Sequence, residues 1–116
     1  GAFPTWLSPL QVRVIPVASA FNEYANSLND SLYSSFVRTE IDCSHDSFSK
    51  KIRSAAITKI PNLLIVGEKE QADKTVTWQR YGSKERQTLA FDSFLPLLQE
   101  EILQRRDWRQ HDKPKV

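Results

Sequence analysis

The chain has 116 residues, of which 40% are hydrophobic, so its length suits one compact domain and leaves no room for a second. The formal net charge of +2 is mildly basic, which permits a polyanionic partner without requiring one. The longest uninterrupted apolar run, Leu63 to Val66, is too short to cross a bilayer, and the opening residues lack the features of a signal peptide. A single cysteine, Cys43, excludes an internal disulfide framework and a multi-cysteine zinc site. These features predict a soluble domain with no membrane partner.

The first half of the chain alternates strand and helix patterns. The β-branched run from Val12 to Val17 predicts a strand, and Ser19 is a candidate cap for a following helix. Apolar residues recur in that helix at helical spacing: Phe21, Tyr24, Ala25, Leu28 and Leu32. The segment 36–42 alternates and predicts a second strand, and a second helix is expected from about Ser47 to the region before Pro61.

The second half predicts three more strands and one helix. Residues 62–67 are apolar on both faces, as in a strand that helices cover on both sides. Residues 74–81 and 87–90 predict an edge hairpin, with Gly82 and Ser83 as its turn. A last helix is expected from Asp92 or Ser93, with Pro96 tolerated in its first turn.

This order of elements predicts an α/β fold with a mixed five-stranded sheet and three flanking helices. The expected domain covers residues 1–106, and residues 107–116 form a polar tail that we expect to fray. The sequence contains no methionine, which fits either a processed mature chain or a domain of a longer protein, and we expect the second.

Catalytic patterns are missing from the sequence. The three glycines lie far apart, so no phosphate-binding loop is present, and no His, Cys and carboxylate group has the spacing of a zinc site. Cys43 and His45 could suggest a thiol–imidazole pair, but a half-buried cysteine beside a loop histidine explains them more simply. We therefore expect these residues to catalyse no reaction, and to hold no cofactor.

Charged and aromatic residues after the third expected strand indicate RNA binding. Glu68 and Glu70 flank Lys69, and in an extended chain the two carboxylates would share one side, where they could accept hydrogen bonds from guanine or cytosine. The next strand offers an indole, an amide and a guanidinium: Trp78, Gln79 and Arg80. The preceding helix adds Lys50, Lys51 and Arg53 as candidates for phosphates or base edges. A solvated helix face and aromatic packing are the alternative explanations.

The opening segment FPTWLSPLQV, residues 3–12, resembles the start of the C-terminal anticodon-binding domain of threonyl-tRNA synthetases. The resemblance continues through KIR (residues 51–53), IPNLLIVG (60–67), GEKE (67–70), TVTWQR (75–80) and LLQEEI (97–102), and covers nearly the whole chain. The resemblance implies the same mixed five-stranded sheet flanked by three helices. It also implies that Glu70 and Arg53 contact the anticodon.

Two positions depart from the bacterial pattern of that family. A family arginine falls at Gln79, between Trp78 and Arg80, and a family asparagine falls at His45. The departures are consistent with a mitochondrial enzyme or with one that reads an altered anticodon.

The resemblance implies that the chain binds the anticodon stem-loop of threonine tRNA as part of a threonine–tRNA ligase in the mitochondrial matrix or the cytoplasm. The parent enzyme would be a homodimer, with ATP and zinc in its catalytic domain. The alternative is an accessory or protein-interaction domain of the same fold that does not read an anticodon.

Overall fold

The computed structural model describes residues 3–105, which form one mixed five-stranded sheet with the strand order β2-β1-β3-β4-β5. The elements along the chain are η1 (Thr5–Leu7), β1 (Val12–Pro16), η2 (Ser19–Phe21), α1 (Asn22–Ser34), β2 (Thr39–Ile41), α2 (Phe48–Thr58), β3 (Asn62–Val66), α3 (Glu68–Asp73), β4 (Thr75–Arg80), β5 (Arg86–Ala90) and α4 (Phe91–Leu103). The predicted α/β fold with a mixed five-stranded sheet is confirmed, and α3 is an additional short helix that the sequence patterns did not predict. The tail 107–116 lies outside the described residues.

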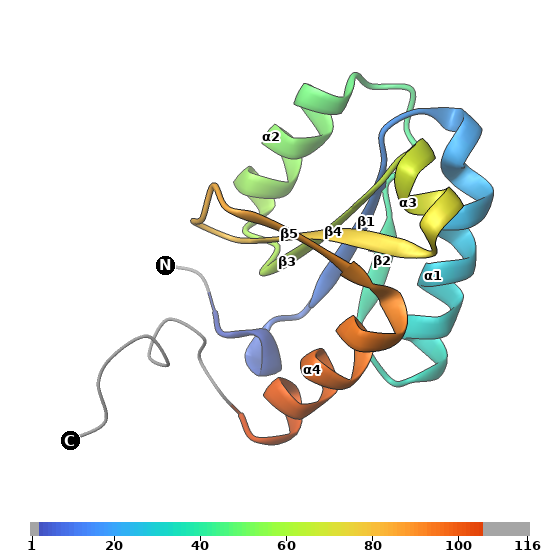
Figure 1. Ribbon diagram of the computed structural model, residues 1–116. Helices are drawn as coiled ribbons and strands as arrows, with labels where there is room; N and C mark the ends of the chain where they lie inside the picture. Colours follow the sequence, from blue (N-terminus) through green and yellow to red (C-terminus); the bar gives the residue numbers. More distant parts are fainter. Residues whose placement is uncertain (1–2, 106–116) are drawn as a thin grey trace.

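The sheet has a parallel part and an antiparallel part. Strand β1 pairs in parallel with β2 and β3, whereas β4 runs antiparallel to β3 and β5. Helix α1 connects β1 to β2 on one side of the sheet, and α2 connects β2 to β3 on the other side (Figure 1). The carboxyl ends of β1, β2 and β3 therefore meet at one edge, which is where open α/β sheets commonly bind ligands.

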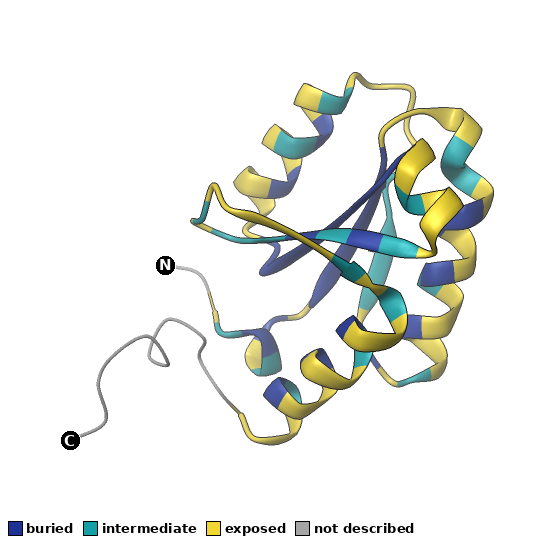
Figure 2. Cartoon of the chain, viewed as in Figure 1, coloured by how far each residue is buried: buried dark blue, intermediate teal, exposed yellow. Residues whose placement is uncertain are grey.

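Two apolar clusters hold the helices on the sheet. The larger cluster packs α1 and α4 against one face through buried residues such as Leu28, Leu64 and Phe94. The smaller cluster packs α2 against the other face, around Ile15, Ala55 and Leu63. Figure 2 shows the consequence: buried residues fill the central strands, while β5 and the outer sides of the helices are exposed. Helix α2 covers β1 and β3 but leaves β4 and β5 largely open on its side.

Helices α1 and α2 both end in a Schellman motif without glycine. Phe36 and Lys59 occupy the left-handed position, with φ of 65° and 61°. The next residue donates back into the helix in each case, from Val37 N to Leu32 O and from Ile60 N to Ala55 O. Val37 and Leu32 belong to the larger apolar cluster and Ile60 to the smaller one, so each motif also brings a buried residue onto the core.

Several predicted boundaries change in the structure. The second strand is shorter than predicted, because Phe36 and Val37 belong to the helix cap and pairing begins at Thr39. Ser19 begins a short 3-10 helix and does not cap α1, whose first residue follows Phe21. Helix α4 begins at Phe91, so Pro96 lies beyond its first turn.

Candidate nucleic-acid interface

The β4–β5 hairpin has two faces of different character. On the face toward α4, Trp78 lies edge-on to Phe94 with ring centroids 4.8 Å apart, and its indole N–H donates to Asn62 Oδ1 at 3.0 Å. Arg80 follows on the same face, where it pairs with the buried Glu101 at 2.9 Å and lies 4.4 Å from the Trp78 ring. The predicted RNA-binding residues Trp78 and Arg80 therefore point into the packing between β4 and α4.

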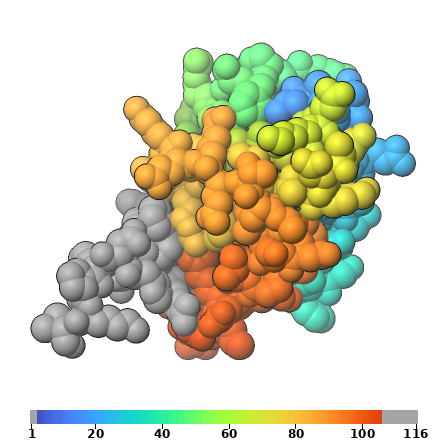
Figure 3. Space-filling model, in the orientation of Figure 1, coloured from blue at the N-terminus to red at the C-terminus, as the bar shows by residue number. Residues whose placement is uncertain are grey.

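The opposite face of the hairpin is polar and forms a surface that we call the open hairpin face. It consists of Thr75, Thr77, Gln79, Arg86 and Thr88. On β4 these residues alternate with the buried Val76 and Trp78, whereas β5 has no buried residue. The hydroxyls of Thr77 and Thr88 lie 3.0 Å apart across the strands, and Arg86 Nε donates to Gln79 Oε1 at 2.9 Å. Residues of α3, β4 and β5 form a continuous part of the molecular surface between α2 and α4 (Figure 3).

Glu70 adjoins this face at the end where β4 begins. It lies in the helix α3, which corrects the expectation that Glu68 and Glu70 continue an extended strand with both carboxylates on one side. One carboxylate oxygen of Glu70 accepts from the backbone N–H of Gly67 at 2.8 Å, and the other accepts from Thr77 Oγ1 at 3.3 Å. Glu70 is thus held in place by a helix cap and by the first strand of the hairpin.

Close packing at position 67 disfavours any side chain larger than that of glycine, because its neighbours would have to shift. A Cβ there would lie 3.0 Å from Val17 Cγ2 and 3.3 Å from the capping carboxylate oxygen of Glu70. The charge of Glu70 also acts on α1: burial raises the pKa of Tyr24, and the nearby carboxylates of Glu70 and Asp92 raise it further. The Tyr24 hydroxyl donates to Thr75 O at 2.7 Å, which ties α1 to the start of β4.

The two cations of the KIR segment lie on different sides of α2. Lys51 is only 2% exposed, and its Nζ donates to the Pro16 carbonyl at the end of β1 at 3.1 Å. Its ammonium therefore contacts the protein interior, so the structure does not support the prediction that Lys51 binds a phosphate. Arg53 lies two positions further on, about 200° around the helix, and is exposed.

His45 lies in the exposed loop between β2 and α2, at the edge where the parallel strands end. The structure therefore brings Glu70 and Gln79 to one surface, places Arg53 and His45 outside the core on the α2 side, and separates Trp78, Arg80 and Lys51 from them. The sequence analysis did not single out Thr77, Thr88 and Arg86, which the structure places on the open hairpin face. The alternation of β4 contained the signal for Thr77, because Val76 and Trp78 share one phase and Thr75, Thr77 and Gln79 share the other.

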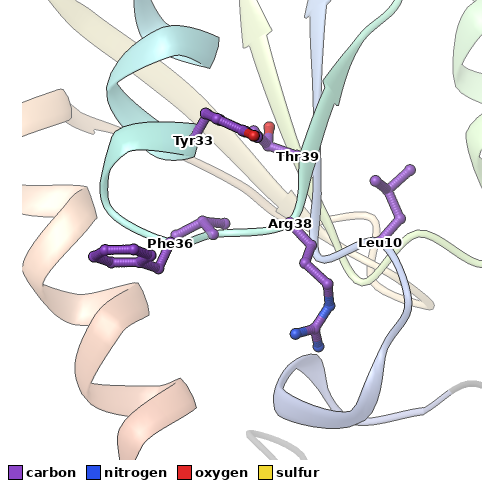
Figure 4. Close-up of a pocket in the computed structure, with 6 residues that line it drawn as sticks. Leu10, Tyr33, Phe36, Arg38 and Thr39 are labelled. Carbon is purple, nitrogen blue, oxygen red and sulfur yellow. The ribbon is translucent and has the colours of Figure 1, made fainter.

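A pocket of about 410 Å³ lies at the other end of the sheet, where β1 and β2 begin. Leu10, Tyr33, Phe36 and Arg38 line it, and the Arg38 side chain extends toward η1 (Figure 4). The Arg38 guanidinium donates to the carbonyls of Trp6 and Ser8, so it anchors the opening segment. This mainly apolar pocket is remote from Glu70 and offers few hydrogen-bonding groups to a nucleic acid.

Within residues 3–105, no three His, Cys, Asp or Glu side chains gather in a way that could hold a metal ion. None of the helices that the structure describes is long and apolar enough to span a lipid bilayer.

Comparison with known families decides what kind of domain this is. A family model described as "Anticodon binding domain" matches residues 11–101, which include the whole sheet and nearly all of α4. The chain belongs to the anticodon binding domain family. The matched residues include Glu70, the open hairpin face and α2.

Similar proteins include threonine–tRNA ligases, as the resemblance of the FPTWL segment predicted. The chain is 43% identical over 103 residues to a threonine–tRNA ligase of Oceanobacillus iheyensis and 46% identical over 103 residues to one of Staphylococcus saprophyticus, covering 88% of this chain in both alignments. It spans only about 16% of the length of these relatives. The solved RNA binding domain of threonyl-tRNA synthetase from Cryptosporidium parvum superposes with a TM-score of 0.83 at 29% identity, over 86% of this chain and 25% of that one.

These comparisons confirm the predicted resemblance to threonyl-tRNA synthetases and do not favour the alternative of an accessory domain that reads no anticodon. They give no support to a mitochondrial location, which stays a prediction from the two departures at Gln79 and His45.

Proposed function

We propose that this domain binds the anticodon loop of threonine tRNA, as the recognition part of a longer threonine–tRNA ligase. The anticodon binding family supports binding of tRNA, and the similarity to threonine–tRNA ligases supports the choice of threonine tRNA. Aminoacylation, with its ATP and zinc sites and a homodimeric arrangement, would belong to the remainder of that enzyme. The compartment, mitochondrial matrix or cytoplasm, stays a prediction.

The observation that carries the proposal is the polar surface formed by Glu70 and the open hairpin face. A carboxylate, two hydroxyls, an amide and a guanidinium follow one another along one side of β4 and β5. Single-stranded bases are recognised through their edges by such groups, and phosphates by guanidinium. The face covered by α1 and α4 offers no comparable row, because apolar side chains fill it.

Glu70 is the residue we assign to base recognition. Each of its oxygens already accepts one hydrogen bond, yet a carboxylate has about four acceptor sites, so further donors can approach. The cap to Gly67 orients the carboxylate before RNA arrives, which lowers the cost of ordering it on binding. A guanine, with its ring N–H and amino group, presents two parallel donors that match a carboxylate.

Titration of the 116-residue chain with anticodon stem-loops of threonine tRNA tests the proposal, using variants in which each anticodon base is changed in turn. We expect binding that weakens with salt and that depends on at least one anticodon base. Equal affinity for every anticodon, with no preference over an unrelated stem-loop, would refute anticodon recognition. The chain alone should give no threonine-dependent exchange of pyrophosphate into ATP.

A further inference from the structure

Arg86, the first residue of β5, carries a guanidinium that the protein holds in one orientation on the open hairpin face. Its backbone pairs with Gln79 across the hairpin, and its Nε donates to Gln79 Oε1 at 2.9 Å. Gln79 is itself oriented, because its Nε2 donates to the Ser83 carbonyl in the turn at 2.9 Å. A chain of two hydrogen bonds therefore fixes one edge of the guanidinium.

An aromatic ring supports the same guanidinium from the side of α2. The guanidinium carbon of Arg86 lies 5.7 Å from the centroid of Phe48, the first residue of that helix. This distance is within the range of a cation–π contact. Arg86 is nevertheless exposed, so the contact orients the side chain without burying it.

This arrangement leaves the outer edge of the guanidinium open. Nε is engaged with Gln79, and within residues 3–105 no hydrogen-bond partner engages the terminal Nη1 and Nη2 nitrogens. These two nitrogens form a planar fork that matches two adjacent acceptor atoms. In RNA, such pairs are two phosphate oxygens or the O6 and N7 atoms of a guanine. An arginine whose side chain only faces solvent does not need its guanidinium held in one orientation.

We propose that Arg86 is a direct RNA contact of this domain and donates through Nη1 and Nη2 to a pair of acceptor atoms of the bound loop. The inference rests on the proposed function and deepens it by naming a residue of the site. Glu70 receives donors at one end of the open hairpin face, and Arg86 offers donors at the other. Thr77 and Thr88 lie between them.

The test compares Arg86→Gln with Lys84→Gln, since Lys84 is an exposed cation two positions away on the same hairpin. Both variants lose one charge, but only the first removes the oriented fork. With the 116-residue chain and a threonine anticodon stem-loop, Arg86→Gln should weaken binding about tenfold more than Lys84→Gln. Arg86→Lys should restore less than half of this loss, because an ammonium lacks the planar fork. Circular dichroism melting should show both Gln variants folded.

Two forms of the result identify the acceptor. A uniform loss over all anticodons, with the salt slope reduced by about one, identifies a phosphate. A loss confined to loops with a particular guanine, and reproduced in wild type by 7-deazaguanine at that position, identifies the base. If wild type binds and Arg86→Gln loses no more than Lys84→Gln, the Arg86 inference is wrong while the proposed function stands. If wild type does not bind the stem-loop, the proposed function fails first.

Discussion

The indole N–H of Trp78 donates to the side-chain oxygen of Asn62 at 3.0 Å, and both residues are buried. The amide nitrogen of Asn62, which is 0% exposed, donates in turn to Thr5 Oγ1 and to the Gln11 carbonyl, both at 3.0 Å. One asparagine of β3 thus joins the opening FPTWL segment to the residue before β1 and to β4. Trp78 belongs to this buried polar network and not to the open hairpin face.

Trp78→Phe should lower the free energy of unfolding by about 1–3 kcal/mol, because it leaves the Asn62 oxygen buried without its donor and removes part of the ring. Denaturant titration measures this change. Trp6→Phe is the control, since Trp6 lies at intermediate exposure in η1 and should change stability less. A Trp78→Phe variant of unchanged stability but altered base preference would return Trp78 to the interface.

Glu70→Gln should remove discrimination at one anticodon base, by about 1–3 kcal/mol on the scale of bidentate base contacts. The amide keeps an oxygen for the cap to Gly67, since Gln also serves in capping boxes, so stability should change by less than about 0.5 kcal/mol. Stem-loop titration and thermal unfolding measure the two effects. Glu70→Ala should in addition lose about 1 kcal/mol of stability with the cap.

An equal loss of affinity for every anticodon in Glu70→Gln would contradict base recognition by this residue. It would leave Glu70 with its structural role alone.

Lys51 and Lys50 provide a matched pair of adjacent lysines, one buried and one exposed. Lys51→Ala should destabilise the domain by about 1–3 kcal/mol, because it removes a packed stem and the donor to the Pro16 carbonyl, and should leave the salt dependence of RNA binding unchanged. Lys50, which pairs with Asp46 at 3.4 Å on the surface, should affect stability by about 0–1 kcal/mol. Unfolding and salt titrations of both variants measure the difference. A reduced salt slope in Lys51→Ala would show that its ammonium reaches the RNA.

Tyr24 should make stability depend on pH in the alkaline range. Its pKa in the folded protein is raised above the ordinary tyrosine value of 10.0, first by burial and then by Glu70 and Asp92. The neutral phenol is therefore favoured by folding, so its contribution is complete below that value and is lost as pH rises through the folded pKa. Urea titrations between about pH 9 and 11 should show a steeper loss in wild type than in Tyr24→Phe.

Tyr33→Phe is the control for this experiment, because Tyr33 lies exposed on the same helix. A parallel decline in wild type and in Tyr24→Phe would contradict the assignment.

Phe36→Gly should stabilise the domain by about 0.5–1 kcal/mol. Phe36 has a φ of 65° and is 95% exposed, so its ring contributes little packing while its Cβ strains the left-handed backbone. Phe36→Ala removes the ring but keeps the strain, and should not give this gain. Equal melting temperatures for the Gly and Ala variants would contradict the effect of backbone strain.

How far the sequence predicts this fold depends on the residues involved. The β-branched run of β1 and the apolar run of β3 predicted two inner strands of the sheet. Helix α2 begins at Phe48, close to the predicted start at about Ser47, whose Oγ accepts from Lys50 N. The ends of α1 and α2 were harder to predict, because glycine usually marks a left-handed helix cap and here Phe36 and Lys59 take that place. Helix α3 is only six residues long, which is too short for a periodic pattern. Its first residues were therefore interpreted as the end of the preceding strand.

The site was partly predictable for related reasons. Gln79 and Glu70 do reach one surface, but Trp78 attracted attention as an aromatic although it shares the phase of the buried Val76. Lys51 lies three positions after Phe48 and four before Ala55, which places it on the core side of α2. Arg86 could not be recognised from sequence, because its importance comes from a cross-strand partner and from a ring on another element.

The position of β5 at the end of the strand order has a consequence for solubility. A terminal strand presents unpaired backbone groups to which the strand of a second copy can add. Charged side chains at such an edge disfavour this addition, and Lys84, Glu85 and Arg86 stand at the start of β5 and in the turn before it. We therefore expect the cation that we assign to RNA also to disfavour self-association of the domain while no RNA is bound. Variants that neutralise the start of β5 should form oligomers at lower protein concentration, and light scattering would detect them.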